Sequence, residues 1–310
     1  MTSHQGQGLP QPEGQRFVAD GGMETNLIFH QGVELPDFAA FPLVQRDEGR
    51  AMLERYYGDY ARIARRVGAG LMLDSPTWRA NPDWGERLGY SSRSLDDINR
   101  RTIEWLAQLR EVYAPAIDEV LISGVVGPRG DGYRPDGSID PDRAADYHLP
   151  QLEAFAAAGA DLATAYTLTD VGEAIGIVRA ASAVSIPVAI SFTVETDGRL
   201  AGGASLGQAI NEVDGAGRPE YFLVNCSHPT HIARAITDPG PWRARIRGLR
   251  PNASTKSHAE LDEAEELDEG DPRALAAAQD ELMDALPGVS IVGGCCGTDA
   301  RHVAALWNVD

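Results

Sequence analysis

The chain has 310 residues, of which 43% are hydrophobic and 24% are charged, so it has the composition of a globular protein and enough length for a sizeable core. Acidic residues outnumber basic ones by 46 to 27, and the formal net charge is -19. Proteins that bind nucleic acids contact the phosphates through clustered Lys and Arg, so this charge argues against a nucleic-acid partner.

The first residues are rich in Gly, Gln and Pro, and we expect a disordered leader over 1–15 followed by one domain over 16–310. This leader has neither the basic start nor the apolar centre of a signal peptide, and no apolar run has the length of a membrane span. These features predict a cytoplasmic protein with no membrane partner. In that compartment the three cysteines are expected to be thiols and not a disulfide framework.

Short apolar runs alternate with longer helical patterns along the rest of the chain. Eight runs predict strands, at 17–22, 70–75, 120–127, 161–168, 187–194, 221–227, 246–253 and 289–296. Helical segments such as 50–70 and 147–160 separate them, which is the pattern of parallel βαβ units. Eight strands close a barrel, so we predict the α/β class and a single-domain (β/α)8 TIM barrel.

A doubly wound open sheet is the alternative fold. It would normally carry a glycine-rich phosphate turn after its first strand, and the sequence there, "DGGMET" at 20–25, does not match GxGxxG. Between the last two predicted strands, the segment 258–288 is strongly acidic in its first half. A solvated helix face or loop is the simpler interpretation, and an acidic rim that attracts a cationic substrate is the other.

All three cysteines stand at the ends of predicted strands: Cys226 ends the sixth, and Cys295 and Cys296 end the eighth. The C-terminal ends of barrel strands converge on the face where active sites lie, so these thiols can meet around one point. Three protein ligands with a fourth position open are typical of a catalytic zinc site.

The cysteine pair is flanked by glycines, which would free the backbone to turn both adjacent side chains toward one metal: Gly293, Gly294 and Gly297. From the residues alone, three simply buried thiols remain an alternative, because free Cys is among the most buried residue types.

Three motifs, "DGGMET" (20–25), "VNCSH" (224–228) and "GGCCGT" (293–298), resemble in order the signatures of the homocysteine S-methyltransferase family. Members of that family are (β/α)8 barrels in which three cysteine thiolates hold Zn²⁺ and the substrate thiol takes the open position. The resemblance therefore implies that Cys226, Cys295 and Cys296 bind Zn²⁺. It further implies transfer of a methyl group from a small sulfonium or ammonium donor to a thiol acceptor, with homocysteine as the expected acceptor and methionine as the product.

The same resemblance implies further substrate-binding residues. Asp20, Gly21 and Gly22 would contact the acceptor, although a turn with an Asp cap explains them as well. The segment "SPTWRAN" (75–81) would place Thr77 and Trp78 along the pocket. An indole suits a cationic methyl donor, and plain core packing is the alternative for Trp78.

Two asparagines and two histidines complete the comparison with the family. Asn225 would hold the strand end that carries a metal ligand, and "RPNAS" (250–254) makes Asn252 a site residue. His228 and His231 are expected to be solvated and not to bind metal. The partners predicted are small molecules, a thiol acceptor and a methyl donor, and the sequence leaves a homo-oligomer open.

Tyr166 is a departure from the family, because it stands where many members carry a glutamate that binds the amino group of homocysteine. A tyrosine offers a hydroxyl but no negative charge for an ammonium group. Glu24 and Glu195 are candidates to replace that charge. A thiol lacking the amino group is therefore an alternative acceptor, and a non-catalytic barrel that binds zinc or a thiol is a further alternative.

Overall fold

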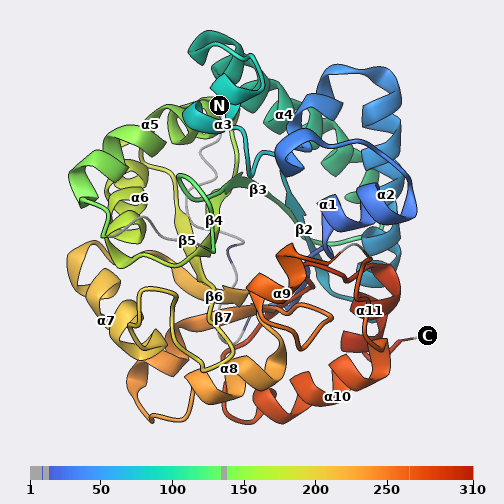
Figure 1. The fold of residues 1–310 in the computed structure, drawn as a ribbon. Helices are drawn as coiled ribbons and strands as arrows, with labels where there is room; N and C mark the ends of the chain where they lie inside the picture. Colours follow the sequence, from blue (N-terminus) through green and yellow to red (C-terminus); the bar gives the residue numbers. More distant parts are fainter. Residues whose placement is uncertain (1–8, 10–13, 134–137, 265, 310) are drawn as a thin grey trace.

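In the computed structural model, which describes residue 9 and residues 14–133, 138–264 and 266–309, eight parallel strands close a barrel in sequence order (Figure 1). The strands are β1 Phe17–Val18, β2 Gly70–Asp74, β3 Val120–Val126, β4 Leu162–Leu168, β5 Val188–Phe192, β6 Tyr221–Asn225, β7 Ile246–Arg250 and β8 Ile291–Val292. Each strand pairs with the next, and β8 pairs with β1 to complete the ring. The prediction of a single-domain (β/α)8 barrel is confirmed, whereas most of the predicted leader, 1–15, lies outside the described residues.

The strands are shorter than the apolar runs suggested, mostly at their C-terminal ends. β1 and β8 keep two residues each, because the "DGG" and "GGCC" segments leave the ladder and turn over the barrel mouth. The residues freed in this way are those that the sequence placed in the site.

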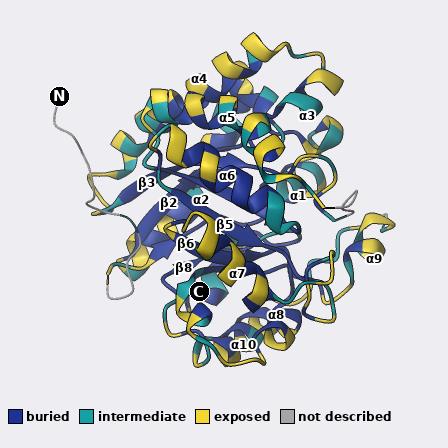
Figure 2. Ribbon diagram, turned by 90° about the vertical axis from the view of Figure 1, so that its left-hand side faces the viewer, coloured by how far each residue is buried: buried dark blue, intermediate teal, exposed yellow. Residues whose placement is uncertain are grey.

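Helices surround the barrel and lie on the surface of the molecule (Figures 1 and 2). They are α1 Met23–Thr25, α2 Asp47–Val67, α3 Pro82–Arg87, α4 Ser92–Tyr113, α5 Pro141–Ala158, α6 Val171–Ala183, α7 Leu206–Ala216, α8 Pro229–Ala235, α9 His258–Asp262, α10 Pro272–Met283 and α11 Ala300–Leu306. The predicted helical segments 50–70 and 147–160 fall mainly on α2 and α5. No helix among the described residues is long and apolar enough to cross a membrane.

Local sequence signals fix the ends of these helices. The carboxylate of Asp140 accepts from the backbone N–H groups of Asp142 and Arg143 at 3.1 and 3.0 Å, so it caps the start of α5. Gly159 ends α5 in the left-handed conformation, at φ 82°, which a glycine adopts without a steric penalty.

The core has two layers. One fills the barrel interior and contains large side chains such as Phe17, Met72, Leu162 and Ile291. The other joins the outer faces of the strands to the helices. Because parallel strands are covered on both faces, most of their residues are buried, and the polar residues at their C-terminal ends mark the position of the site.

Candidate active site

Three cysteine sulfurs meet at the C-terminal end of the barrel. Cys226 directly follows β6, Cys295 and Cys296 follow β8, and the three Sγ atoms all lie within 4.8 Å of one another. In the part of the chain that the structure describes, no other group of three or more His, Cys, Asp or Glu side chains is arranged to hold a metal. This group can therefore bind a metal ion when its sulfurs are reduced.

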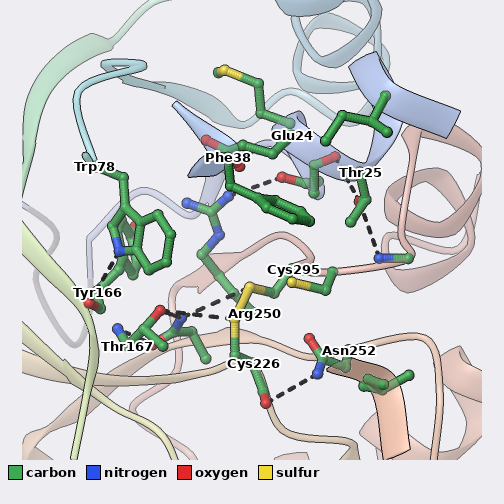
Figure 3. Close-up of a pocket in the computed structure, with 18 of the residues that line it drawn as sticks. Glu24, Thr25, Phe38, Trp78, Tyr166, Thr167, Cys226, Arg250, Asn252 and Cys295 are labelled. Atoms are coloured by element: carbon green, nitrogen blue, oxygen red, sulfur yellow. Dashed lines mark hydrogen bonds between the residues drawn. A yellow bond between two sulfur atoms is a disulfide. The ribbon is translucent and has the colours of Figure 1, made fainter. Parts of the chain in front are cut away.

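The structure joins Cys226 and Cys295 in a disulfide and leaves Cys296 as a free thiol (Figure 3). The expectation of three thiols is wrong for this form of the protein. The physical reason is the convergence of β6 and β8, which brings the two Cα atoms to 5.3 Å, inside the usual disulfide range. The bonded pair comes from two strands and is not the adjacent pair Cys295–Cys296, so metal binding requires reduction of this bond.

Cys226 has an unusual backbone conformation, with φ 52°. A non-glycine residue in this left-handed region costs of the order of 1–3 kcal/mol, so its surroundings must hold it. Its carbonyl accepts from Nδ2 of Asn252 at 3.0 Å and lies 2.6 Å from Nε2 of His258. These two contacts fix the turn that directs the sulfur toward the barrel axis.

The glycines around the cysteine pair have two different roles. Gly297 alone of the three has a positive φ, 77°, so the predicted backbone freedom applies there. At Gly293 an added Cβ would lie 2.6 Å from the carbonyl oxygen of Asp20, and at Gly294 it would collide with Thr298. These two glycines permit close packing of β8 against β1 and the following turn.

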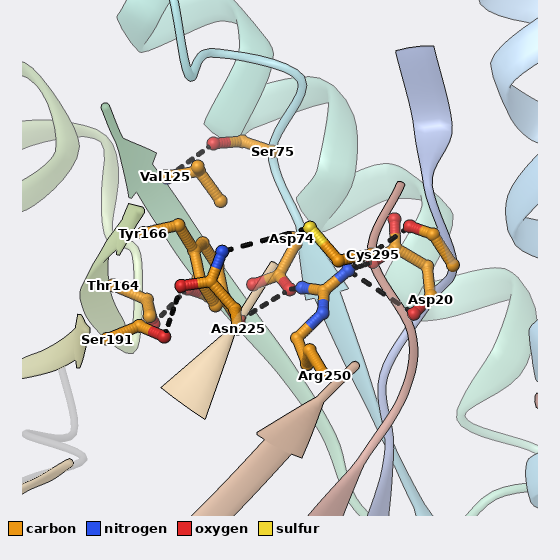
Figure 4. Close-up of polar contacts among 12 residues, drawn as sticks. Asp20, Asp74, Ser75, Val125, Thr164, Tyr166, Ser191, Asn225, Arg250 and Cys295 are labelled. Atoms are coloured by element: carbon orange, nitrogen blue, oxygen red, sulfur yellow. Dashed lines mark hydrogen bonds and ion pairs between the residues drawn. The ribbon is translucent and has the colours of Figure 1, made fainter. Parts of the chain in front are cut away.

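Asn225 connects the cysteine cluster to neighbouring strands (Figure 4). Its Oδ1 accepts from the hydroxyl of Ser191 at 2.6 Å and from the backbone N–H of Thr167 at 3.0 Å. Its Nδ2 donates to the hydroxyl of Thr167 at 2.9 Å and approaches the sulfur of Cys295 at 3.8 Å. The hydroxyl of Thr167 in turn lies 3.8 Å from the sulfur of Cys226, so amide and hydroxyl donors face two of the three sulfurs.

A buried ion-pair network lies beside the cysteines and was not found from the sequence. Arg250, at the end of β7, pairs with both Asp20 and Asp74, and its Nε donates to the carbonyl of Gly294 at 3.0 Å (Figure 4). The hydroxyl of Tyr166 donates to Asp74 at 3.0 Å. Burial raises the pKa of Asp20 to about 7, although the charge of Arg250 opposes the rise. The only sequence signal was Asp74 at the end of the otherwise apolar strand β2.

A cavity of about 630 Å³ opens above these groups. Most of the predicted site residues line it, namely Asp20, Gly21, Gly22, Trp78, Tyr166, Asn225, Cys226, Asn252, Cys295 and Cys296. Trp78 stands on one side of the cavity and the cysteine sulfurs on the other (Figure 3). The structure therefore brings residues from β1, β2, β4, β6, β7 and β8 or the turns that follow them to one place.

Thr77 does not line the cavity, so the expectation for this residue is wrong. Its side chain is fully buried, and its hydroxyl donates to the carbonyl of Val125 at 2.8 Å and lies 2.6 Å from that of Ser75. The hydroxyl is satisfied inside the protein and holds the loop that carries Trp78.

The acidic segment after β7 contributes to the mouth of the cavity. Several of its residues line the opening: His258, Leu261, Asp262, Ala264, Glu266, Leu267 and Asp268. Other carboxylates on the same wall belong to Glu24, Asp37 and Asp131, whereas the arginines that line this cavity among the described residues are Arg79 and Arg250. The structure therefore has acidic residues along the wall of the cavity.

The remaining candidates separate into two groups. Glu24 lines the cavity, and burial raises its pKa. Glu195 does not line this cavity, and its carboxylate lies 2.9 Å from Nδ1 of His258. His228 and His231 are not members of the metal-binding group, and the expectation that they are solvated is wrong, because both are buried. His228 instead caps the start of α8 through Thr230.

A barrel with three cysteine sulfurs and a cavity at the C-terminal ends of its strands is typical of an enzyme that acts on a small molecule. The family model described as homocysteine S-methyltransferase matches residues 17–309. The chain belongs to this family, and it is a methyltransferase that acts on a thiol.

Named relatives span nearly the whole chain. The chain is 26% identical to the homocysteine S-methyltransferase of Escherichia coli (strain K12) over 94% of each protein. It is 24% identical to homocysteine S-methyltransferase 2 of Arabidopsis thaliana, over 93% of this chain and 91% of the relative.

The same fold is found in the metallated form of the homocysteine methyltransferase MmuM from Escherichia coli, with a TM-score of 0.74 and 23% identity over 96% of each chain. The oxidised form of MmuM gives a TM-score of 0.73.

Proposed function

We propose that the protein is a zinc-dependent S-methyltransferase that moves a methyl group from a small sulfonium or ammonium donor to homocysteine, giving methionine. The observation that carries this proposal is the cluster of three cysteine sulfurs within 4.8 Å of one another on the wall of a cavity, in a chain of this family.

The donor set suits zinc. Cys226, Cys295 and Cys296 would hold the ion, because their sulfurs lie within 4.8 Å of one another and thiolates are ligands that zinc prefers. When bound, zinc would leave one position for the acceptor sulfur and keep that sulfur as a thiolate. Asn225 and Thr167 would orient Cys295 and Cys226, since their donors lie 3.8 Å from these sulfurs.

The proposed reaction is a direct displacement. The acceptor sulfur attacks the methyl carbon, the bond from this carbon to the donor sulfur or nitrogen breaks, and its electron pair stays with the donor, which becomes neutral. The thiol proton is lost to solvent before the attack. The chain contributes chiefly by holding the two reactants in line inside the cavity, and no general base at the carbon is required.

The cavity lining supports a cationic methyl donor. The aromatic rings of Phe38, Trp78 and Tyr133 line it together with the acidic residues of the rim. Aromatic faces attract sulfonium and ammonium groups, and a negative cavity concentrates cations. Trp78 is held in place by its Nε1, which donates to the carbonyl of Tyr166 at 3.4 Å, although the guanidinium of Arg79 stacks on its ring at 4.0 Å.

The remaining cavity residues support a role in binding the acceptor. We assign the turn Asp20–Gly21–Gly22, Asn225 and Asn252 to its surroundings, and Glu24 to its ammonium group. Tyr166 favours the second candidate, a thiol without an amino group. It has no negative charge for an ammonium group, and its hydroxyl already donates to Asp74.

The test combines metal content with turnover. Freshly reduced protein should contain about one zinc per chain and should form methionine from homocysteine with at least one donor among S-methylmethionine, other sulfoniums and betaine. The Cys296→Ser variant should lose both properties, and Lys256→Ala, which does not line this cavity, should keep them. Zinc binding without turnover would favour the non-catalytic alternative, turnover only with an amine-free thiol would favour the second acceptor, and absence of zinc in reduced protein would refute the proposal.

A further inference from the structure

Arg79 is a cation of the cavity wall that forms no ion pair with any of the described residues. It lies after β2, and its guanidinium carbon stands 4.0 Å from the ring centre of Trp78 and 3.7 Å from that of Trp84. Two indoles thus hold the plane of the guanidinium, as aromatic faces do for arginine. The side chain is fixed in one place by packing and not by an ion pair.

Its hydrogen-bonding capacity is mostly unused. A guanidinium has five N–H donors, and among the described residues the one bond that Arg79 makes runs from Nη1 to the carbonyl of Gly130, at 3.0 Å. Nε is buried without a partner. Within the described residues, no carboxylate comes within ion-pair distance of Arg79.

The negative charges around Arg79 act on it without contacting it. Burial lowers its pKa to about 10, and the charges of Asp131, Glu24 and Asp37 oppose this shift from a distance. These acids line the same cavity, but none of them contacts the guanidinium. An anion entering the cavity would supply the partner that the protein itself does not provide.

Arg79 lines the same cavity as the three cysteines, together with Glu24 and Tyr133. A small molecule with its reacting sulfur or methyl group at the cysteines can extend its other end to Arg79.

We propose that Arg79 binds the carboxylate of a substrate, so that the cavity selects zwitterions over simple cations. The bidentate geometry of a guanidinium matches a carboxylate, and the acidic and aromatic lining binds the cationic end of the same molecule. This inference rests on the proposed function and specifies the chemistry of its substrates. The carboxylate can belong to the methyl donor or to the acceptor, and the two are distinguished by experiment.

The test compares ligands that differ only in the carboxylate. The donor pair is S-methylmethionine and a methylsulfonium of the same length without the carboxylate, and the acceptor pair is homocysteine and 3-aminopropane-1-thiol. In the Arg79→Gln variant, kcat/KM for the carboxylated member of one pair should fall by about 10- to 100-fold, which is the usual effect of losing a charged hydrogen bond. The value for its carboxylate-free partner should change by less than about threefold, and Arg79→Lys should restore part of the loss.

Arg87→Gln is the matched control. Arg87 also stacks on Trp84, at 4.6 Å, but it is exposed, is paired with Asp37 and does not line the cavity. This variant should keep the wild-type preference. An equal loss for both members of each pair, or no loss for either, would overturn the inference.

Direct titration separates this inference from the proposed function. S-methylmethionine and homocysteine are titrated into folded wild-type and Arg79→Gln protein, without turnover. A 10- to 100-fold weaker Kd for one of them in the variant supports the assignment even if no methyl transfer occurs. An unchanged Kd, or a wild type that binds neither ligand, refutes it, whereas a wild type that binds but never transfers a methyl group refutes only the proposed function.

Discussion

The hydroxyl of Tyr166 donates to the carboxylate of Asp74 at 3.0 Å, and the aromatic ring of Tyr166 lies 4.8 Å from the guanidinium carbon of Arg250. Tyr166 is thus part of the buried ion-pair network next to the cysteines. This gives a physical reason for a tyrosine at a position where a negative charge would be expected: Asp20 and Asp74 already supply two carboxylates for one arginine. A third carboxylate there would have no partner.

Loss of the arginine should be severely destabilising. In Arg250→Met, two buried carboxylates lose their common partner, and we expect a loss of about 3–5 kcal/mol in the free energy of unfolding. Urea denaturation measures this loss. Arg101→Met removes an exposed pair with Asp97 and should cost less than about 1 kcal/mol, so similar losses in the two variants would contradict the assignment.

Two substitutions at Tyr166 separate the contribution of its hydroxyl from the effect of a negative charge at this position. Tyr166→Phe removes one buried hydrogen bond and should cost about 1–3 kcal/mol. Tyr166→Glu should cost more, because it adds a carboxylate beside Asp20 and Asp74, and it should not improve turnover of homocysteine. A stable Tyr166→Glu variant with higher kcat/KM for homocysteine would show instead that this position is free to receive the ammonium group.

Asn225 should control the affinity for metal. Its Nδ2 faces the sulfur of Cys295 at 3.8 Å, and its Oδ1 fixes the backbone of Thr167. Residues that orient metal ligands typically change metal affinity by about 10- to 100-fold when removed. We expect this loss in Asn225→Ala, measured by competition with a zinc chelator under reducing conditions. Asn308→Ala, at a residue that does not line the cavity, is the control, and equal zinc affinity in the two variants would refute the role.

Low pH should reduce the stability that Asp299 contributes at the N-terminus of α11. Burial acts to raise the pKa of Asp299, but hydrogen bonds from His302 and Arg301 outweigh it and hold the pKa well below its usual range. A carboxylate with a depressed folded-state pKa stabilises the protein above its unfolded pKa of about 3.9, and this contribution is lost as the pH falls through the folded-state pKa. Urea unfolding between pH 7 and pH 3 should therefore show a smaller loss for Asp299→Asn than for the wild type. Parallel profiles would contradict the prediction.

The strands of this fold could be predicted from the sequence, whereas the contacts between residues far apart in the sequence could not. Each strand and the position of each cysteine depend on local apolar patterns, so the barrel and the meeting of the sulfurs were predictable. The pairing of Arg250 with Asp20 joins residues 230 positions apart, and no local pattern specifies it. Thr77 was misplaced for a related reason, because a motif indicates which segment lies at the cavity but not which of its side chains turns inward.

The close packing at Gly293 predicts that this position needs a glycine because there is no room for a side chain. An added Cβ would lie 2.6 Å from the carbonyl oxygen of Asp20 and 2.9 Å from the carbonyl carbon of Ala19, and these backbone atoms cannot yield cheaply. We expect Gly293→Ala to cost about 1–3 kcal/mol and to weaken zinc binding, because β8 must move away from β1 and carry Cys295 with it. Gly215, inside α7, has nothing within 4 Å of an added Cβ, so Gly215→Ala should stabilise the protein by about 0.5–1 kcal/mol. Thermal unfolding and zinc titration of both variants test this contrast, and a Gly293→Ala protein as stable as the wild type would show that β8 can shift without affecting the site.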